Sequence, residues 1–397
     1  MQGARILILG GGDGGLVAAG TLRKLLGREH EVTLIDRERD YAFRPSFLWV
    51  MLGQKHPRQV LRSRRALATK GIEFLEAEIA EIDLVGRQVT VSRRGAEEPL
   101  GVGQAPRRAG ALGRLAAKPI LASATIPETR REARRKTERE ERPYDYLIIS
   151  LGADLDPEAV PGAGLAVRQG QAHVFYDLEG ATRLREALRE FQGGTITILV
   201  SHPVHKCPPA PYDAAFLLDD YFRRRRLRDR VTIRLVTPDL QPLPADGPEV
   251  GKRVLKLLQE RHIDFQPGSW VTGIDPRRGQ ILLEGGGRVD YHLLLLVPPH
   301  KAPEVVQRAG LTSRSEDGGD TSGWIIADPK TLATGYEDVY AVGDVTGIRL
   351  PVAHEGSTGF LPKAGVFAHF QAEVVARNIA SAIKGEKMKA VYDGFVL

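Results

Sequence analysis

The stretch Ala4–Gly27, ARILILGGGDGGLVAAGTLRKLLG, decides the fold of this chain. The apolar run Ile6–Leu9 predicts a buried strand, a glycine cluster predicts a tight turn, and the segment ending at Gly27 predicts a helix. The next segment, HEVTLIDRE at 30–38, predicts a second strand. The chain therefore opens with a β-α-β unit.

The glycines of this turn have a spacing that suits a dinucleotide. Gly10, Gly12 and Gly15 form G-x-G-x-x-G. The first glycine permits the turn, the second lets the backbone approach a pyrophosphate, and the third lets helix and strand pack closely. Asp36 follows Gly15 by 21 residues, where a carboxylate can accept hydrogen bonds from ribose hydroxyls. These four residues predict a dinucleotide-binding site.

A second α/β block follows in the middle of the chain. YDYLIISLGA at 144–153 predicts a buried strand, and helix and strand patterns then alternate up to YHLLLLVPP at 291–299. VYAVGDV at 339–345 and the apolar helix at 365–385 complete the first block. We therefore predict two Rossmann-like, three-layer α/β domains with the second inserted into the first, namely residues 1–155 and 323–397, and residues 156–322.

The basic charge of the chain is local. Residues 93–142, rich in Arg and Ala, carry 13 Lys and Arg against 7 Glu, which matches the formal net charge of +6 for the whole chain. This segment lacks an apolar periodicity, so we expect a solvated insertion within the first domain. An anionic docking role is the alternative.

Composition excludes several classes of protein. The chain has 397 residues with 42% hydrophobic content, and its longest apolar run, LLLLV at 293–297, is far too short for a bilayer. The N-terminus lacks a secretory signal, so we expect a cytoplasmic protein. The single cysteine, Cys207, excludes an intrachain disulfide and a multi-cysteine metal site, and we expect no metal.

Cys207 lies where a second nucleotide-binding turn would carry glycines. The turn after TITILV reads SHPVHKCPPAP (201–211) and has no glycine, while its prolines lack N–H donors. Conventional NAD(P)H binding is therefore disfavoured. A position before a helix, with Lys206 adjacent, favours a reactive thiolate. A small, inert, buried cysteine is the alternative.

Three segments resemble known flavoproteins. TLATGYEDVYAVGDV (331–345), with Gly343 and Asp344, resembles the second FAD fingerprint of flavoproteins with two dinucleotide-binding domains. YDYLIISLGA, with Gly152, resembles the strand that precedes their second domain. KCPPAPYDAAFLLDDYFRRR (206–225) resembles the cysteine segment of sulfide:quinone oxidoreductases and flavocytochrome c sulfide dehydrogenases.

That resemblance implies a cofactor and a reaction. It implies non-covalent FAD, with Pro45 and Ser46 of FRPSFLWVMLG (43–53) beside the flavin ring. In LPKAGVFAHFQAEVVARNI (361–379), Lys363 would stabilise negative charge on the reduced ring. Cys207 would accept electrons from sulfide, a persulfide or a polysulfide, and a quinone or another non-nicotinamide acceptor would receive them.

The chain departs from that family at its second cysteine. In relatives this cysteine lies just beyond a strand resembling YDGFVL, whereas the present sequence stops at Leu397. A natively short protein and a truncated sequence both remain open. With one thiol, the chemistry left is attack on an external sulfur species or a single cysteine–flavin adduct.

Other readings remain open. His202, His205, His300 and His354 could act as bases or serve structural roles. The patch RRRRLRDR from Arg223 suits a solvated helix end better than a nucleic-acid or membrane contact.

The alternatives to the sulfide reaction are an NAD(P)H-dependent flavin reductase and an FAD-binding partner module without turnover. Membrane-surface contact and a homodimer are further expectations, and no nucleic-acid partner is expected.

Overall fold

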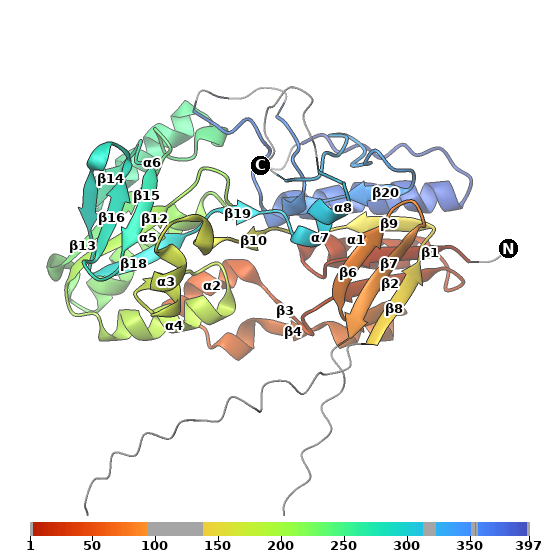
Figure 1. The fold of residues 1–397 in the computed structure, drawn as a ribbon, viewed down its shortest axis with the longest axis horizontal. Coiled ribbons are helices and arrows are strands. Elements are labelled where there is room, and N and C mark those ends of the chain that lie inside the picture. The colour runs from red at the N-terminus through yellow and green to blue at the C-terminus, as the bar shows by residue number, and fades with distance from the viewer. Residues whose placement is uncertain (1–2, 94–137, 313–322, 351–353, 355, 395–397) are drawn as a thin grey trace, which may run out of the picture.

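The chain folds into two lobes (Figure 1). The structure, a computed structural model, describes residues 3–93, 138–312, 323–350, 354 and 356–394. One lobe combines the N-terminal elements with the C-terminal α8 and β20, and the middle of the chain forms the other lobe. The predicted insertion of one α/β unit into another is confirmed.

The first lobe is built on a parallel sheet of five strands. Its order is β20-β9-β1-β2-β5, so a strand from the C-terminal part pairs with β9. The glycine turn follows β1, the central strand, and the turn carrying Gly343 follows the edge strand β20. The strands are β1 (Arg5–Leu9), β2 (Glu31–Asp36), β5 (Glu73–Glu76), β9 (Tyr146–Ile149) and β20 (Val339–Ala341).

Alternation along β1 explains the three layers of this lobe. Ile6 and Ile8 enter a core with the helices α1 (Asp13–Leu25) and α8 (Gly365–Ile383). Leu7 and Leu9 point to the opposite face. There they meet an antiparallel sheet made of β6 (Glu78–Asp83), β7 (Gln88–Arg93) and β8 (Glu138–Pro143).

Strand β8 corrects the predicted insertion at 93–142. Arg93 ends β7, and the charged run Glu138–Pro143 pairs with β7 in antiparallel register, with Arg93 opposite Glu138. An edge strand needs backbone pairing and one partly covered face, so a run of charged residues can occupy it without an apolar period. Residues 94–137 lie outside the described residues, and so does any docking role for them.

The second lobe has a parallel sheet of order β11-β18-β12-β13-β14. All five residues of β18 are buried, as expected for a strand covered on both faces. A separate antiparallel sheet, β15-β16-β17, packs onto the same core. The strands are β11 (Ala172–His173), β12 (Gly194–Val200), β13 (Val231–Val236), β14 (Ile263–Gln266), β15 (Val271–Asp275), β16 (Gln280–Leu283), β17 (Arg288–Asp290) and β18 (Leu293–Val297).

A pair of short strands and a short helix are among the contacts that join the lobes. β10 (Asp154–Leu155) pairs in antiparallel fashion with β19 (His300–Lys301). The short helix α2 (Phe47–Met51) buries its apolar residues in the core of the second lobe.

The domain boundaries at 155 and 322 remain predictions. The other elements are α3 (Ala163–Arg168), α4 (Leu178–Glu190), α5 (Ala210–Arg224), α6 (Pro248–Glu260), α7 (Glu304–Arg308), β3 (Asp40–Ala42) and β4 (Leu61–Ser63).

The arginine-rich end of α5 is more structural than the sequence predicts. Asp219 is buried and accepts hydrogen bonds from the Nε atoms of Arg223 and Arg228. Arg228 also donates to the carbonyl of Val231 at 2.6 Å, so part of the patch anchors α5 rather than facing solvent. Within the described ranges, every helix is too short or too polar to cross a membrane.

Two glycines of α1 give opposite predictions for the same substitution. A Cβ at Gly15 would lie 1.9 Å from the carbonyl oxygen of Gly10, whereas one at Gly20 would meet nothing within 4 Å. Gly15→Ala should therefore lower the free energy of unfolding by about 1–3 kcal/mol through overpacking. Gly20→Ala should raise it by about 0.5–1 kcal/mol. Urea denaturation measures both, and equal effects would contradict the close approach of α1 to β1.

Candidate functional site

The glycine turn has the geometry that its spacing predicts. Gly10 has a φ of +96°, and a Cβ there would lie 2.4 Å from the carbonyl oxygen of Ser150. Gly15 brings α1 against this turn, as described above. At Gly12, which begins α1, a Cβ would meet nothing within 4 Å, so the backbone faces open space. The turn thus offers bare backbone at a helix N-terminus, which favours a phosphate.

Asp36 braces the same turn. Its Oδ2 accepts a hydrogen bond from the backbone N–H of Gly11 at 2.6 Å. The buried Arg64 donates through Nε and an Nη to the carbonyl of Gly11 at 2.9 and 2.7 Å, and it lies 3.6 Å from Asp36. Sequence reasoning missed Arg64, because a single arginine outside any motif carries no local signal of burial.

One large cavity lies between the lobes. Its volume is about 1080 Å³. The glycine turn and the α8 N-terminus contribute to one part of its wall, and the cysteine turn, α2 and α5 contribute to another. Among the predicted site residues, Gly10, Gly15, Asp36 and Ser46 do not line it. Those that do are Gly12, Pro45, Gly152, Cys207, Gly343, Asp344 and Lys363.

The cavity wall contains polar groups that lack protein partners. The Oδ1 atom of Asp344 is buried without a hydrogen-bond partner among the described residues. The N-termini of α1 and α8 reach the cavity through Gly12 and Gly365, and neither helix has a side-chain cap. A buried unpaired carboxylate oxygen and two uncapped helix N-termini suit a ligand that carries both hydroxyl and phosphate groups. These residues fit FAD.

The cysteine turn is tied to the first lobe by backbone. The N–H of Cys207 donates to the carbonyl of Lys363 at 2.6 Å, within a bridge that pairs Lys206 with Lys363. The carbonyl of Cys207 accepts from Ala210 N–H at 2.9 Å and from the Tyr176 hydroxyl at 3.4 Å. Cys207 has a φ of +53°, which is uncommon outside glycine. These contacts hold the thiol residue at the cavity wall.

The expected thiolate is not supported. Burial, and to a lesser degree the carboxylate of Asp213, raise the pKa of the Cys207 thiol from its ordinary value to about 11. The start of α5 compensates only in part: the backbone N–H of Ala210 lowers the pKa of the thiol, whereas the N–H groups of Tyr212 and Asp213 donate to the carbonyl of Pro209. Sequence reasoning counted a free helix N-terminus, but prolines and these bonds leave it few free donors.

The ammonium of Lys363 is fully engaged by the first lobe. Its Nζ donates to the carbonyls of Asp344 at 2.8 Å and Thr346 at 3.0 Å. It also lies 3.4 Å from the ring centroid of Trp324, a cation–π contact. Burial lowers the pKa of Lys363 to about 8. The role toward a reduced flavin stays a prediction, since these partners already use the charge.

The candidate histidines differ in burial. His205, within the cysteine turn, and His300 are both buried, and their Nδ1 atoms lie 3.1 and 2.9 Å from the carbonyls of His202 and Pro298. Their Nε2 atoms have no hydrogen-bond partner among the described residues. Burial lowers the pKa of His205 to about 4 and that of His300 well below its ordinary value. His354 is exposed. In the described part of the chain, no three side chains are grouped to hold a metal ion.

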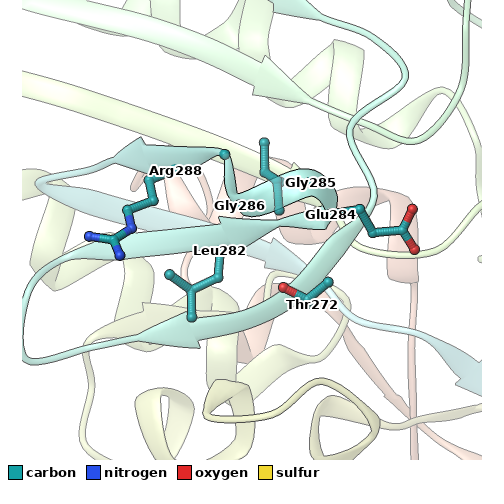
Figure 2. Close-up of a pocket in the computed structure, with 8 residues that line it drawn as sticks. Thr272, Leu282, Glu284, Gly285, Gly286 and Arg288 are labelled. Carbon is teal, nitrogen blue, oxygen red and sulfur yellow. The ribbon is translucent and has the colours of Figure 1, made fainter.

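A second hollow lies outside the cavity between the lobes. It is formed by the β16–β17 hairpin and has a volume of about 510 Å³. Gly285 and Gly286 line it between Glu284 and Arg288 (Figure 2). None of the predicted site residues lines this hollow, so the cavity between the lobes is the candidate site.

The sequence also matches a known family. The family described as pyridine nucleotide-disulphide oxidoreductase matches residues 4–201 and 213–367, which together make up most of the chain. The chain belongs to this family. Membership in the pyridine nucleotide-disulphide oxidoreductase family confirms the expectation of an FAD-dependent oxidoreductase.

Individual relatives resemble the chain over nearly its full length. The mitochondrial sulfide:quinone oxidoreductase of Mus musculus is 21% identical over 402 residues, which cover 98% of this chain and 74% of the relative. The sulfide-quinone reductase of Aquifex aeolicus is 23% identical, with coverage of 97% and 78%. A crystal structure of the sulfide:quinone oxidoreductase from Aquifex aeolicus superposes with a TM-score of 0.74 at 22% identity, covering 96% and 77%. The resemblance stated from sequence is confirmed.

The state of the Cys207 thiol is measurable. With its pKa near 11, the rate of alkylation by iodoacetamide should keep rising beyond pH 9, because only the thiolate reacts. Asp213→Asn removes a neighbouring negative charge and should accelerate alkylation at pH 8 about threefold or more. Asp220→Asn, on the same helix but paired with Arg224, is the control and should change little. A rate plateau below pH 8 in the parent protein would contradict the raised pKa.

Proposed function

We propose that this protein binds FAD non-covalently in the cavity between its lobes. The bare backbone at Gly12 would hold the pyrophosphate. The unpaired Oδ1 of Asp344 would accept a hydrogen bond from a hydroxyl of the ribityl chain. Pro45 and Gly152, both on the cavity wall, would flank the cofactor. FAD, when bound, supplies a two-electron acceptor.

We further propose that a sulfur-centred donor reacts at Cys207. The observation that carries this proposal is the position of the chain's single cysteine, which lines the cavity and is held there by Lys363. With hydrosulfide as donor, a bond forms between the cysteine sulfur and the donor sulfur. The thiol of Cys207 would lose its proton, and Cys207 would become a persulfide that keeps the donor's hydrogen; bound FAD would supply the two-electron oxidant that this bond requires.

The acceptor in this proposal is a quinone or another acceptor that is not a nicotinamide. The rim of the cavity carries large apolar side chains that are 40–47% exposed, which suits a flat apolar ring. They are Phe43, Trp49, Val366 and Phe370. The proposal also includes a cytoplasmic location, contact of this rim with a membrane surface, and a homodimer. Relatives named for sulfide and quinone support the donor and acceptor classes.

The nicotinamide alternative lacks a pyrophosphate cradle. The turn after β12 has no glycine between Ser201 and Pro211, and the N–H groups at the start of α5 are already bonded. Side chains and used donors both oppose a second pyrophosphate. We therefore rank NAD(P)H-dependent flavin reduction below the sulfur reaction. We rank an FAD-binding partner module without turnover below both.

Substitution of Gly12 tests the cofactor site. Gly12→Val places a branched side chain where the pyrophosphate would lie, and the open space there should leave the fold intact. The purified variant should lose its flavin absorbance, or bind added FAD at least about tenfold more weakly. Circular dichroism and thermal unfolding would confirm folding. A Gly12→Val protein that is folded and as yellow as the parent would place FAD elsewhere.

Anaerobic reduction tests the donor. Sulfide should bleach the flavin of the parent protein within seconds, whereas Cys207→Ser should be slower by about a hundredfold or more, because the bond-forming sulfur is lost. NADH in a parallel experiment should bleach neither. Rapid reduction by NADH would select the nicotinamide alternative, and a flavin that neither donor reduces would select the partner module.

A further inference from the structure

Lys206 is a buried cation with spare hydrogen-bond donors. Its side chain lines the cavity next to Cys207 and the residue is 8% exposed. In the described part of the chain, its Nζ has one acceptor, the carbonyl of Ala153 at 3.2 Å. An ammonium carries three N–H groups, and a buried cation without sufficient acceptors is costly. Lys206 therefore has capacity for a ligand.

A second cation stands on the same cavity wall. Arg44 lines the cavity, and no ion pair or hydrogen bond joins its guanidinium to another described residue. Burial is the larger cause of the lowered pKa of Lys206, and the positive charge of Arg44 is the second cause. Two like charges on the wall of one cavity repel each other, and an anion bound between them would offset this repulsion.

The acids near Lys206 do not neutralise this pair. Asp344, Asp154 and Asp177 raise the pKa of Lys206, yet none lies within ion-pair distance of it. Asp154 lies 3.8 Å from Arg37, and Asp177 accepts the N–H of Gly180 at 2.6 Å as the cap of α4. Their charges act on Lys206 only at a distance.

Lys363, on the wall of the same cavity, differs from Lys206 because protein groups already engage its ammonium. Two carbonyls and the face of Trp324 take up its ammonium. The open positive charge is therefore that of Lys206 and Arg44. Asp213, which faces Cys207 from α5, repels anions on its side of the thiol, so an anion is favoured on the Lys206 side.

We propose that Lys206 and Arg44 form an anion-binding site beside Cys207, and that its ligand is the hydrosulfide anion of the reaction. This rests on the sulfur chemistry proposed above and adds the residues that select the donor. Phe175 and Tyr176 also line the cavity, so its wall combines aromatic and cationic side chains. Reduced flavin is the other anion that this charge could serve.

Thiocyanate, an inert and weakly hydrated monoanion, probes the site directly. Titrated into the oxidised FAD-loaded protein, it should perturb the flavin absorbance in a saturable way. Lys206→Met and Arg44→Met should each weaken thiocyanate binding by about tenfold or more, the loss expected for one charge-assisted hydrogen bond. Lys206→Arg should retain binding within about threefold. Lys256→Met, on the far helix α6 and paired with Glu260, controls for net charge.

Anaerobic sulfide reduction separates the two anions. If the site holds hydrosulfide, Lys206→Met raises the half-saturating sulfide concentration about tenfold and leaves the limiting rate within about threefold of the parent. A lowered limiting rate at unchanged half-saturation would assign the charge to reduced flavin and overturn the proposal. Thiocyanate binding that is absent, or equal in parent and Lys206→Met, would also overturn it. If sulfide fails to bleach the flavin of the parent protein while thiocyanate binding still depends on Lys206, the proposed sulfur reaction is wrong and the proposed anion site is retained.

Discussion

The hydrogen bond from Cys207 N–H to the carbonyl of Lys363 sets the architecture of the site. It joins a turn of the second lobe to the segment that precedes α8 in the first. Lys363 connects further, because its side chain donates to the carbonyls of Asp344 and Thr346. One residue thus links the cysteine turn, the turn after β20 and the start of α8. The wall of the cavity between the lobes depends on that link, since each of these segments contributes to it.

The same link determines the chemical state of the thiol. The turn docks against the first lobe with Cys207 half-buried and at a positive φ, and the first N–H groups of α5 are used within the chain. Burial and Asp213 then favour the neutral thiol. Positive charge comes instead from Lys206 and Arg44, which stand on the cavity wall. In the proposed site the two roles are separate: the raised pKa favours a neutral Cys207 thiol, and Lys206 and Arg44 would attract the anion.

The second lobe shows how a nucleotide fold can be kept while its binding turn changes. Its parallel sheet and the β12-turn-α5 unit are those of a dinucleotide-binding domain, and the family match spans both lobes. Prolines and used donors nevertheless remove the pyrophosphate cradle from that turn. The fold is stabilised by strand order and core packing, which a change in the turn leaves intact. The turn can therefore present a cysteine to the cavity without cost to the sheet.

The sequence by itself determined the apolar strands, the glycine turn and the inserted arrangement, because apolar alternation and the backbone demands of glycine are local. Glycine spacing picked out Gly12, the turn without glycines picked out Cys207, and the resemblance of a short motif picked out Asp344; the cavity brings the three together. Only the tertiary structure decided that Glu138–Pro143 is a strand, that Arg64 supports Gly11 and that Trp324 covers Lys363. It also brought Asp213 close to Cys207 and partly buried the thiol, which together raise its pKa. Burial, charge and pairing depend on residues distant in sequence, and a local pattern does not contain them.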